Sequence, residues 1–261
     1  MDEDLLLLST PAEHVLMIEF NRPHVMNAIG TPTGHAMLDV FTRLSHEGRY
    51  RCAILTGAGD RAFSAGGDLK ERNGMTDEQW LRQHELFERV NFMIADCPVP
   101  IIAAVNGVAY GGGCELALAC DFIYAADTAR FALTETRLGI LPGGAGTQNL
   151  PRAVGERRAK ELILSAEPFG AQDALDWGMV NRLFPADLLR QEAIAMAEKI
   201  AGNAPLAVRQ AKKAIGYGMQ MDKRTGMIFE IEAYNRLVTT QDRLEGVRAF
   251  NEKRRPDFRG C

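Results

Sequence analysis

Three glycine-containing loops (57–70, 106–115 and 134–148) and two glutamates are the parts of this sequence whose spacing suggests chemistry. The segment 106–115 has three consecutive glycines immediately before an amphipathic run that contains Glu115. Glycine lets a ligand approach the backbone closely. The first N–H groups of a helix have no partner within it and lie at the positive end of its dipole. The segment therefore predicts an oxyanion site with Glu115 beside it; a tight packing turn with Glu115 on the surface is the alternative.

Glu135 offers a second carboxylate. It follows two β-prone runs, 121–126 and 130–133, and precedes another glycine-rich turn. If these runs align as neighbouring strands, the Glu135 carboxylate faces the site that Glu115 borders. Paired carboxylates next to backbone donors suit proton transfer at a carbon next to a carbonyl group. Taken by itself, Glu135 also fits an ordinary residue at the start of a helix.

Other catalytic and cofactor motifs do not match. In the loop 57–70, Ala62 stands where a dinucleotide fingerprint needs its third glycine, and the loop 134–148 lacks the Gly-Lys-Ser/Thr end of a phosphate loop. The five histidines are scattered and no C-x-x-C pair occurs, so we expect no metal site. Ser64 lies in no G-x-S-x-G turn. Cys114 has no accompanying histidine motif, which favours a buried structural thiol.

The composition is that of a soluble globular protein. The 261 residues are 46% hydrophobic and 25% charged, with a net charge of -4, so no overall surface for polyanions is implied. No apolar run approaches the ~20 residues needed to span a bilayer, and the run 5–8 is too short for a signal peptide. Five cysteines, an odd number without a spacing pattern, favour a reducing, cytoplasm-like compartment.

Short apolar runs predict the strands that must position these loops. Buried strands are expected at 52–56, 99–105 and 121–125, and the runs 5–8 and 14–20 can form a hairpin before them. Strands that recur after helices favour parallel pairing, because a tight turn cannot reach a parallel neighbour. The glycine loops then lie at strand ends, where ligands bind in α/β folds.

Helical spacing of apolar residues predicts the remaining elements. One helix begins with Thr31 as its cap, a polar helix covers about 77–95, and a short helix follows Gly113. From about residue 155 the chain is helical, with helices predicted over 187–200, from Pro205 to 216–218, over 222–238 and over 241–252, the last opened by Thr239. We expect a strand-rich core with a helical appendage that packs against a neighbouring subunit.

With these residues the sequence resembles the enoyl-CoA hydratase/isomerase (crotonase) superfamily, nearly from end to end. The resemblance is carried by Ala-Gly-Gly-Asp-Leu at 65–69, Gly-Gly-Gly-Cys-Glu-Leu-Ala at 111–117 and Leu-Pro-Gly-Gly-Ala-Gly-Thr-Gln at 141–148. Within the family, the sequence looks closest to hydratases of the 3-methylglutaconyl-CoA type. This likeness is carried by Asp-Leu-Lys-Glu-Arg at 68–72 and by the motifs that start at Glu135 and Asp242.

The resemblance implies the α/β fold of the crotonase superfamily. Residues 1–200 would form a crotonase-like spiral of ββα units that holds the active site, and residues 201–261 a C-terminal helical trimerisation region. The assembly implied is a homotrimer or a hexamer made of two trimers.

The resemblance also implies the site residues. Glu115 and Glu135 fall on the family's two catalytic glutamates, and the N–H groups of Ala65 and Gly112 on its oxyanion hole for the thioester carbonyl. The contacts to coenzyme A would come from His24, Val25, Ala65, Gly66, Gly67, Asp68, Leu69, Phe250 and Lys253, the last two from a neighbouring subunit. Gly67 stands where Ala is commoner. No metal or redox cofactor is implied, because coenzyme A only carries the substrate.

The activity implied is reversible addition of water across the 2,3 double bond of an enoyl-CoA thioester, as in fatty acid metabolism. Glu115 would take a proton from water, and Glu135 would deliver one to the α-carbon. The alternatives are another acyl-CoA reaction of the family (methylglutaconyl-CoA hydration, isomerisation or lyase chemistry) and a non-enzymatic RNA-associated protein. A relative binds RNA through a lysine-rich helix, but the segment 33–48 holds only Arg43 among Lys and Arg. We therefore expect neither a nucleic-acid nor a membrane partner.

Overall fold

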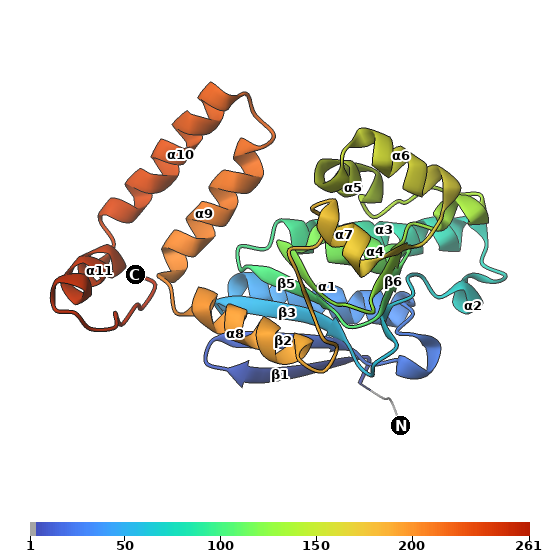
Figure 1. Ribbon diagram of the computed structural model, residues 1–261, viewed down its shortest axis with the longest axis horizontal. Helices are drawn as coiled ribbons and strands as arrows, with labels where there is room; N and C mark the ends of the chain where they lie inside the picture. The colour runs from blue at the N-terminus through green and yellow to red at the C-terminus, as the bar shows by residue number, and fades with distance from the viewer. Residues whose placement is uncertain (1–3) are drawn as a thin grey trace.

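A six-stranded sheet lies at the centre of the protein, in the computed structural model that describes residues 4–261. Its first two strands pair antiparallel, and the others pair parallel (Figure 1). In sheet order the strands are β1 (Leu6–Ala12), β2 (Val15–Phe20), β3 (Cys52–Gly57), β5 (Ile101–Val105), β7 (Phe122–Ala126) and β10 (Arg182–Phe184). Every residue of β2, β3 and β5 is buried, which fits their continuous apolar sequences.

A second, four-stranded sheet consists of very short strands. It contains β4 (Ala62–Ser64), β6 (Val108–Tyr110), β8 (Arg130–Ala132) and β9 (Phe169–Gly170) in that order. Each of β3, β5 and β7 is followed directly by a strand of this second sheet and then by helical residues. This repeat confirms the spiral of ββα units that the family resemblance implies.

Helices cover the two sheets and connect their strands. The long helices α1 (Thr31–His46) and α3 (Asp77–Ala95) pack against each other, and α8 (Leu189–Ala201) packs on β3 and β5. The shorter helices are η1 (Pro23–Val25), α2 (Leu69–Arg72), α4 (Gly112–Ala119), η2 (Glu135–Leu138), α5 (Gly146–Val154), α6 (Glu156–Ser165) and α7 (Ala171–Asp176). Short connections between strand and helix place α2, α4 and η2 directly after strands β4, β6 and β8.

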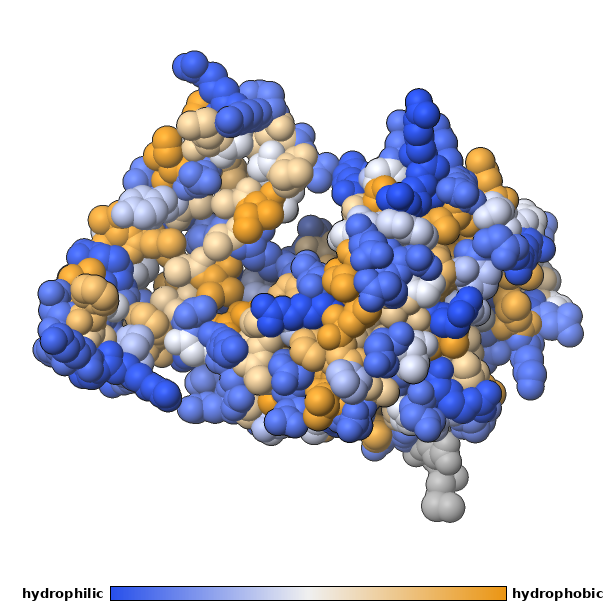
Figure 2. Space-filling model, viewed as in Figure 1, coloured by the Kyte–Doolittle hydropathy of each residue, from blue (hydrophilic) through white to orange (hydrophobic). Residues whose placement is uncertain are grey.

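The last three helices stand apart from the sheets as an arm. Figure 1 shows α9 (Pro205–Gly218) and α10 (Lys223–Val238) side by side. Helix α11 (Gln241–Asn251) lies at the end of the molecule that is farthest from α2 in this view. Apolar side chains appear on the surface of this arm (Figure 2), and Met227, Ile231 and Tyr234 of α10 are more than half exposed. Within residues 4–261, no helix is long and apolar enough to cross a membrane.

The predicted strands and long helices are confirmed within two residues at most ends, but two predicted caps are wrong. Gly30, not Thr31, is the N-cap of α1; Thr31 is already the first helical residue, and its N–H group donates to the Glu71 carboxylate. Thr240, not Thr239, caps α11, and its hydroxyl accepts from the Arg243 N–H group. Only one strand of the second sheet was predicted, the run 130–133, and its expected pairing with 121–126 is wrong, because β8 pairs with β6 and β9 while β7 lies in the first sheet. The other strands of two or three residues leave no periodic pattern.

Candidate active site

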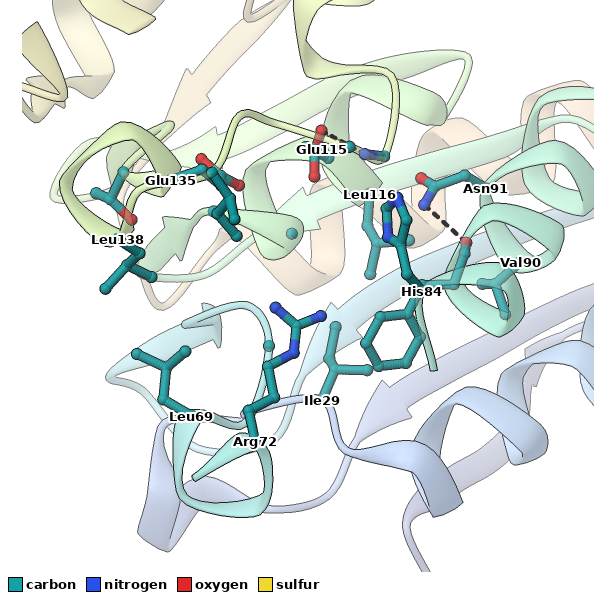
Figure 3. A pocket seen from close by; sticks show the side chains of 18 of the residues that line it. Ile29, Leu69, Arg72, His84, Val90, Asn91, Glu115, Leu116, Glu135 and Leu138 are labelled. Carbon is teal, nitrogen blue, oxygen red and sulfur yellow. Dashed lines mark hydrogen bonds between the residues drawn. The ribbon is translucent and has the colours of Figure 1, made fainter. Parts of the chain in front are cut away.

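A cavity of about 430 Å³ lies where α2, α3, the start of α4 and η2 meet (Figure 3). Its wall is mostly apolar, with Ile29, Met37, Leu69, Leu116, Leu138 and Leu141 among the lining residues. Both predicted catalytic residues, Glu115 and Glu135, line it, together with Ala65, Gly67 and Gly112. Residues far apart in the sequence therefore meet in one pocket of the size that small ligands use.

Glycine is required where the start of α4 approaches the loop after β4. Gly66 has a φ of +88°, and a Cβ atom there would lie 2.7 Å from the Tyr110 carbonyl oxygen and 2.9 Å from the Gly112 nitrogen. A Cβ atom on Gly113 would collide with the Ser64 carbonyl oxygen. Because no side chain separates the two segments, their backbone N–H groups reach the same edge of the cavity.

Two of these N–H groups have no acceptor within residues 4–261. The Gly67 nitrogen lies 3.8 Å from the position of a Cβ atom on Gly112, and Gly112 is the first residue of α4, where N–H groups lack helical partners. The N–H group of Ala65, by contrast, donates to the Met26 carbonyl oxygen at 2.9 Å. This corrects the prediction for Ala65: the pair of free donors is Gly67 and Gly112.

Glu115 is held by backbone donors in the first turn of α4. Its side chain is buried, and its Oε1 atom accepts from the Gly144 N–H group at 2.7 Å and from the Gly146 N–H group at 2.8 Å. Figure 3 shows the other oxygen directed toward the pocket. Burial, with a smaller effect from the charge of Glu135, raises the Glu115 pKa to about 7. The interpretation of Glu115 as a surface residue is therefore wrong.

Glu135 is the first residue of η2, so it is both a helix-start residue and part of the pocket wall. The residue is only 8% exposed, and its buried Oε2 atom has no hydrogen-bond partner. Burial raises the Glu135 pKa. Gly111, with a φ of +51°, passes so close that a Cβ atom there would lie 3.3 Å from Glu135 Oε1. A buried carboxyl oxygen without a partner can hold a proton for a bound substrate.

The predicted contacts to coenzyme A are only partly brought together. Leu69, Gly67 and Ala65 line the cavity, and Gly66 lies between them. Asp68 caps α2 through its side chain and pairs with Arg22 at 2.9 Å, so it holds the loop in shape. His24 and Val25 form η1, outside the residues that line the cavity.

Phe250 and Lys253 belong to the arm and lie away from this pocket. Phe250 is on α11 and 84% exposed, and Lys253 follows that helix. Within one chain they do not meet the other predicted contacts (Figure 1).

Several pocket residues were not predicted, because the polar helix expected over 77–95 was assigned no residue of the site. Trp80, His84, Phe87 and Asn91 of α3 all line the cavity. Their spacing of four, three and four residues is that of one helical face, and this signal could have found them. Arg72 at the end of α2 lines it as well. No cluster that could bind a metal ion occurs among residues 4–261.

The comparisons with known proteins agree with this fold. The family model described as enoyl-CoA hydratase/isomerase matches residues 10–261, and the chain belongs to that family. The crystal structure of an enoyl-CoA hydratase from Bacillus anthracis superposes with a TM-score of 0.97 at 45% identity, covering 99% of this chain and 100% of that one.

Two curated relatives carry different substrates in their names. The short-chain-enoyl-CoA hydratase of Clostridium acetobutylicum is 40% identical over 241 residues, 92% of each chain. The mitochondrial methylglutaconyl-CoA hydratase of Mus musculus is 38% identical over 250 residues, 94% of this chain and 80% of that one. The predicted likeness to hydratases of the methylglutaconyl-CoA type is thus found among the relatives.

Proposed function

We propose that this protein adds water reversibly across the 2,3 double bond of an enoyl-CoA thioester. The observation that carries the proposal is a single cavity with two buried carboxyl groups and two free backbone N–H groups. Hydration needs these parts: donors for the charge on the thioester oxygen, a base for water and an acid for carbon. The names of the relatives support the same reaction.

The thioester oxygen would accept hydrogen bonds from the N–H groups of Gly67 and Gly112. When water attacks the β-carbon, electron density moves through the double bond onto this oxygen, which becomes enolate-like. Donors that are already fixed in place stabilise that charge without reorganising, and each is worth roughly 10²–10³ in rate in known oxyanion holes. The dipole of α4 adds to the effect, since Gly112 is its first residue.

The two glutamates would divide the proton transfers between them. Glu115 accepts two backbone hydrogen bonds, which favour its ionised form, so it takes the proton from water through its free oxygen. The hydroxyl bonds to the β-carbon, and Glu135 gives its proton to the α-carbon. The pair then exchanges protons with solvent and returns to its starting state. General acid–base help of this kind contributes about 10²–10⁴ in rate.

The proposed assembly is a trimer or a pair of trimers in which the helical region 201–261 packs against neighbouring chains. The exposed apolar side chains of the arm support it. In that assembly, Phe250 and Lys253 of one chain would contact the coenzyme A bound by the next. We also propose a reducing, cytoplasm-like compartment, which fits five free cysteines, four of them buried.

Two isosteric variants test the reaction. Glu115→Gln and Glu135→Gln each keep the shape of the side chain, so both should bind crotonyl-CoA but lose its hydration by at least 10³-fold. Turnover is followed by the loss of the conjugated enoyl absorbance, and binding by calorimetry. Near wild-type turnover in either variant would refute the pairing, and a product other than the 3-hydroxyacyl thioester would point to another reaction of the family.

A further inference from the structure

Arg72 places a cation without an anionic partner in the wall of the acyl pocket. The residue is half-buried and lines the cavity. Its Nε–H group donates to the Gln83 side-chain oxygen at 2.7 Å. Its two terminal nitrogens have neither a hydrogen-bond acceptor nor an ion-pair partner within residues 4–261. Figure 3 shows the guanidinium directed into the cavity, across from the two glutamates.

The guanidinium is fixed in this position by its surroundings. Gln83 is buried, and its amide nitrogen donates to the Thr31 hydroxyl at 2.8 Å, which holds the oxygen that accepts from Arg72. The guanidinium carbon lies 4.4 Å from the centre of the Trp80 ring and 5.7 Å from that of Phe87. It also lies 3.3 Å from the position of a Cβ atom on Gly67, close to the proposed oxyanion donors.

The neighbouring carboxylates do not neutralise this cation directly. Glu71 is turned away and accepts from the Thr31 N–H group with both oxygens. Glu135 is near enough to influence Arg72 electrostatically but makes no contact of ion-pair length with it. A guanidinium that has lost part of its hydration and has two free N–H edges binds a carboxylate well, because its geometry matches two parallel hydrogen bonds.

We propose that Arg72 recognises a carboxylate at the distal end of the acyl chain, so that the substrate class is the monothioester of a short unsaturated dicarboxylic acid. This inference rests on the proposed hydratase function, which fixes the orientation of the chain. The thioester oxygen lies at Gly67 and Gly112, and the reacting carbons lie between the two glutamates. Arg72 lines the same cavity of about 430 Å³ and its guanidinium faces into it, so a carboxylate one or two bonds beyond the β-carbon would lie in the space that Arg72 faces.

The test compares three substrates with the same purified protein. Crotonyl-CoA has a short neutral tail, glutaconyl-CoA has a carboxylate in place of one methyl hydrogen, and 5-methylhex-2-enoyl-CoA replaces that carboxylate with an isopropyl group of similar size. We expect kcat/KM for glutaconyl-CoA to exceed that for the neutral isostere by at least tenfold. Charge-assisted, bidentate hydrogen bonds are worth about 10–100-fold in binding.

Variants then assign the preference to one residue. Arg72→Met should lower the ratio of kcat/KM between glutaconyl-CoA and the isostere by at least tenfold, and Arg72→Lys should keep part of it, because a single ammonium retains charge but not the planar fork. Lys70→Met is the matched control: it removes an exposed cation from the same helix and should leave the ratio unchanged. Gln83→Leu keeps Arg72 but removes the hydrogen bond that holds its guanidinium, and should lower the ratio by less than Arg72→Met.

The outcomes separate this inference from the proposed function. The inference is wrong if the wild type hydrates crotonyl-CoA but has a higher kcat/KM for the neutral isostere than for glutaconyl-CoA. It is also wrong if Arg72→Met changes kcat/KM for these two substrates by the same factor, because Arg72 then does not recognise a carboxylate. An equal change would show that Arg72 acts only on the charge of Glu135. If the wild type hydrates none of the three thioesters, the proposed function itself fails.

Discussion

The two glutamates differ in what surrounds their oxygens, although both are buried in one cavity. Glu115 is held by two backbone N–H groups, whereas one oxygen of Glu135 has no partner. Burial raises the pKa of each, and their mutual repulsion adds to the effect on Glu115. Such groups titrate as a pair, which passes through a state that holds one proton. This is the state that hydration needs, with one acid and one base.

We expect the pH profile of kcat/KM for crotonyl-CoA to be bell-shaped. As the pH falls below the Glu115 pKa of about 7, the base becomes protonated and is lost; at higher pH Glu135 ionises and the acid is lost. Initial rates between pH 4 and 10 measure the two limbs. A profile that is flat over this range would contradict the paired mechanism.

Glu115 should also make stability depend on pH. Its pKa rises from 4.5 in the unfolded chain to about 7, so its contribution is fully present below pH 4.5 and is lost as the pH rises through 7. The loss is of the order of 3 kcal/mol, since each pKa unit corresponds to about 1.4 kcal/mol. Glu115→Gln should therefore gain stability relative to the wild type between pH 5 and pH 8.

Denaturant unfolding of both proteins at these two pH values, at equal protein concentration, measures the gain. Glu161→Gln provides the control, because Glu161 is exposed and its substitution removes no buried carboxyl. A difference between wild type and Glu115→Gln that is the same at both pH values would show that the Glu115 carboxyl is not desolvated by folding.

At the scale of elements, the site depends on how closely α4 approaches β4. Gly113→Ala introduces a methyl group against the Ser64 carbonyl oxygen, and neither backbone can yield easily. We expect α4 to shift, so that the Gly112 N–H group moves and kcat falls by at least tenfold, with a lower midpoint of thermal unfolding. Gly216→Ala in α9 is the control, because nothing lies within 4 Å of the new atom and Ala favours a helix. Equal activity and stability in the two variants would contradict the close contact.

The elements were predictable from sequence where hydrophobic periodicity is strong. The buried run at 52–56 became β3 and the polar helix at 77–95 became α3. Apart from the run at 130–133, the short strands of the second sheet carry no such signal, and their pairing depends on the tertiary fold. The cap predicted at Thr31 was wrong, because the helix begins at Thr31 and its free N–H group is satisfied by the Glu71 carboxylate, which lies 40 residues further along the chain.

The site was predicted at the two glutamates and at Gly112, which the glycine-rich motif marks. The second backbone donor was misplaced at Ala65, since only the fold shows that its N–H group already bonds to Met26 while that of Gly67 is free. Arg72 and the α3 wall were missed for a different reason. Their role comes from the cavity that they face, which no local pattern of the sequence describes.

At the scale of the whole molecule, the arm leaves an apolar face of α10 uncovered in the single chain. Met227, Ile231, Tyr234 and Val238 follow helical spacing, and all are at least 42% exposed. Such a face is suited to contact between subunits. The wild type should therefore have the mass of three or six chains in light scattering.

Ile231→Asp combined with Tyr234→Asp should shift this mass toward one chain of 28.7 kDa, because charges would be buried at the interface. Glu230→Ala, a neighbouring exposed position, should leave it unchanged. A wild type that is already monomeric would contradict the proposed assembly.

The same assembly predicts an effect on binding from a residue remote from the pocket of its own chain. Phe250→Ala should raise the Kd for crotonyl-CoA several-fold, whereas Val247→Ala on the same helix should not. Calorimetry on both variants checks this, and unchanged binding in Phe250→Ala would remove Phe250 from the coenzyme A site.

The most direct test of the central claim is a crystal structure of the Glu115→Gln variant with bound crotonyl-CoA. We expect the thioester oxygen within about 3.1 Å of both the Gly67 and the Gly112 nitrogens, which is the reach of an oxyanion donor. The 2,3 double bond should lie between residue 115 and Glu135. A thioester oxygen bonded elsewhere, or a double bond that faces neither residue, would contradict the account.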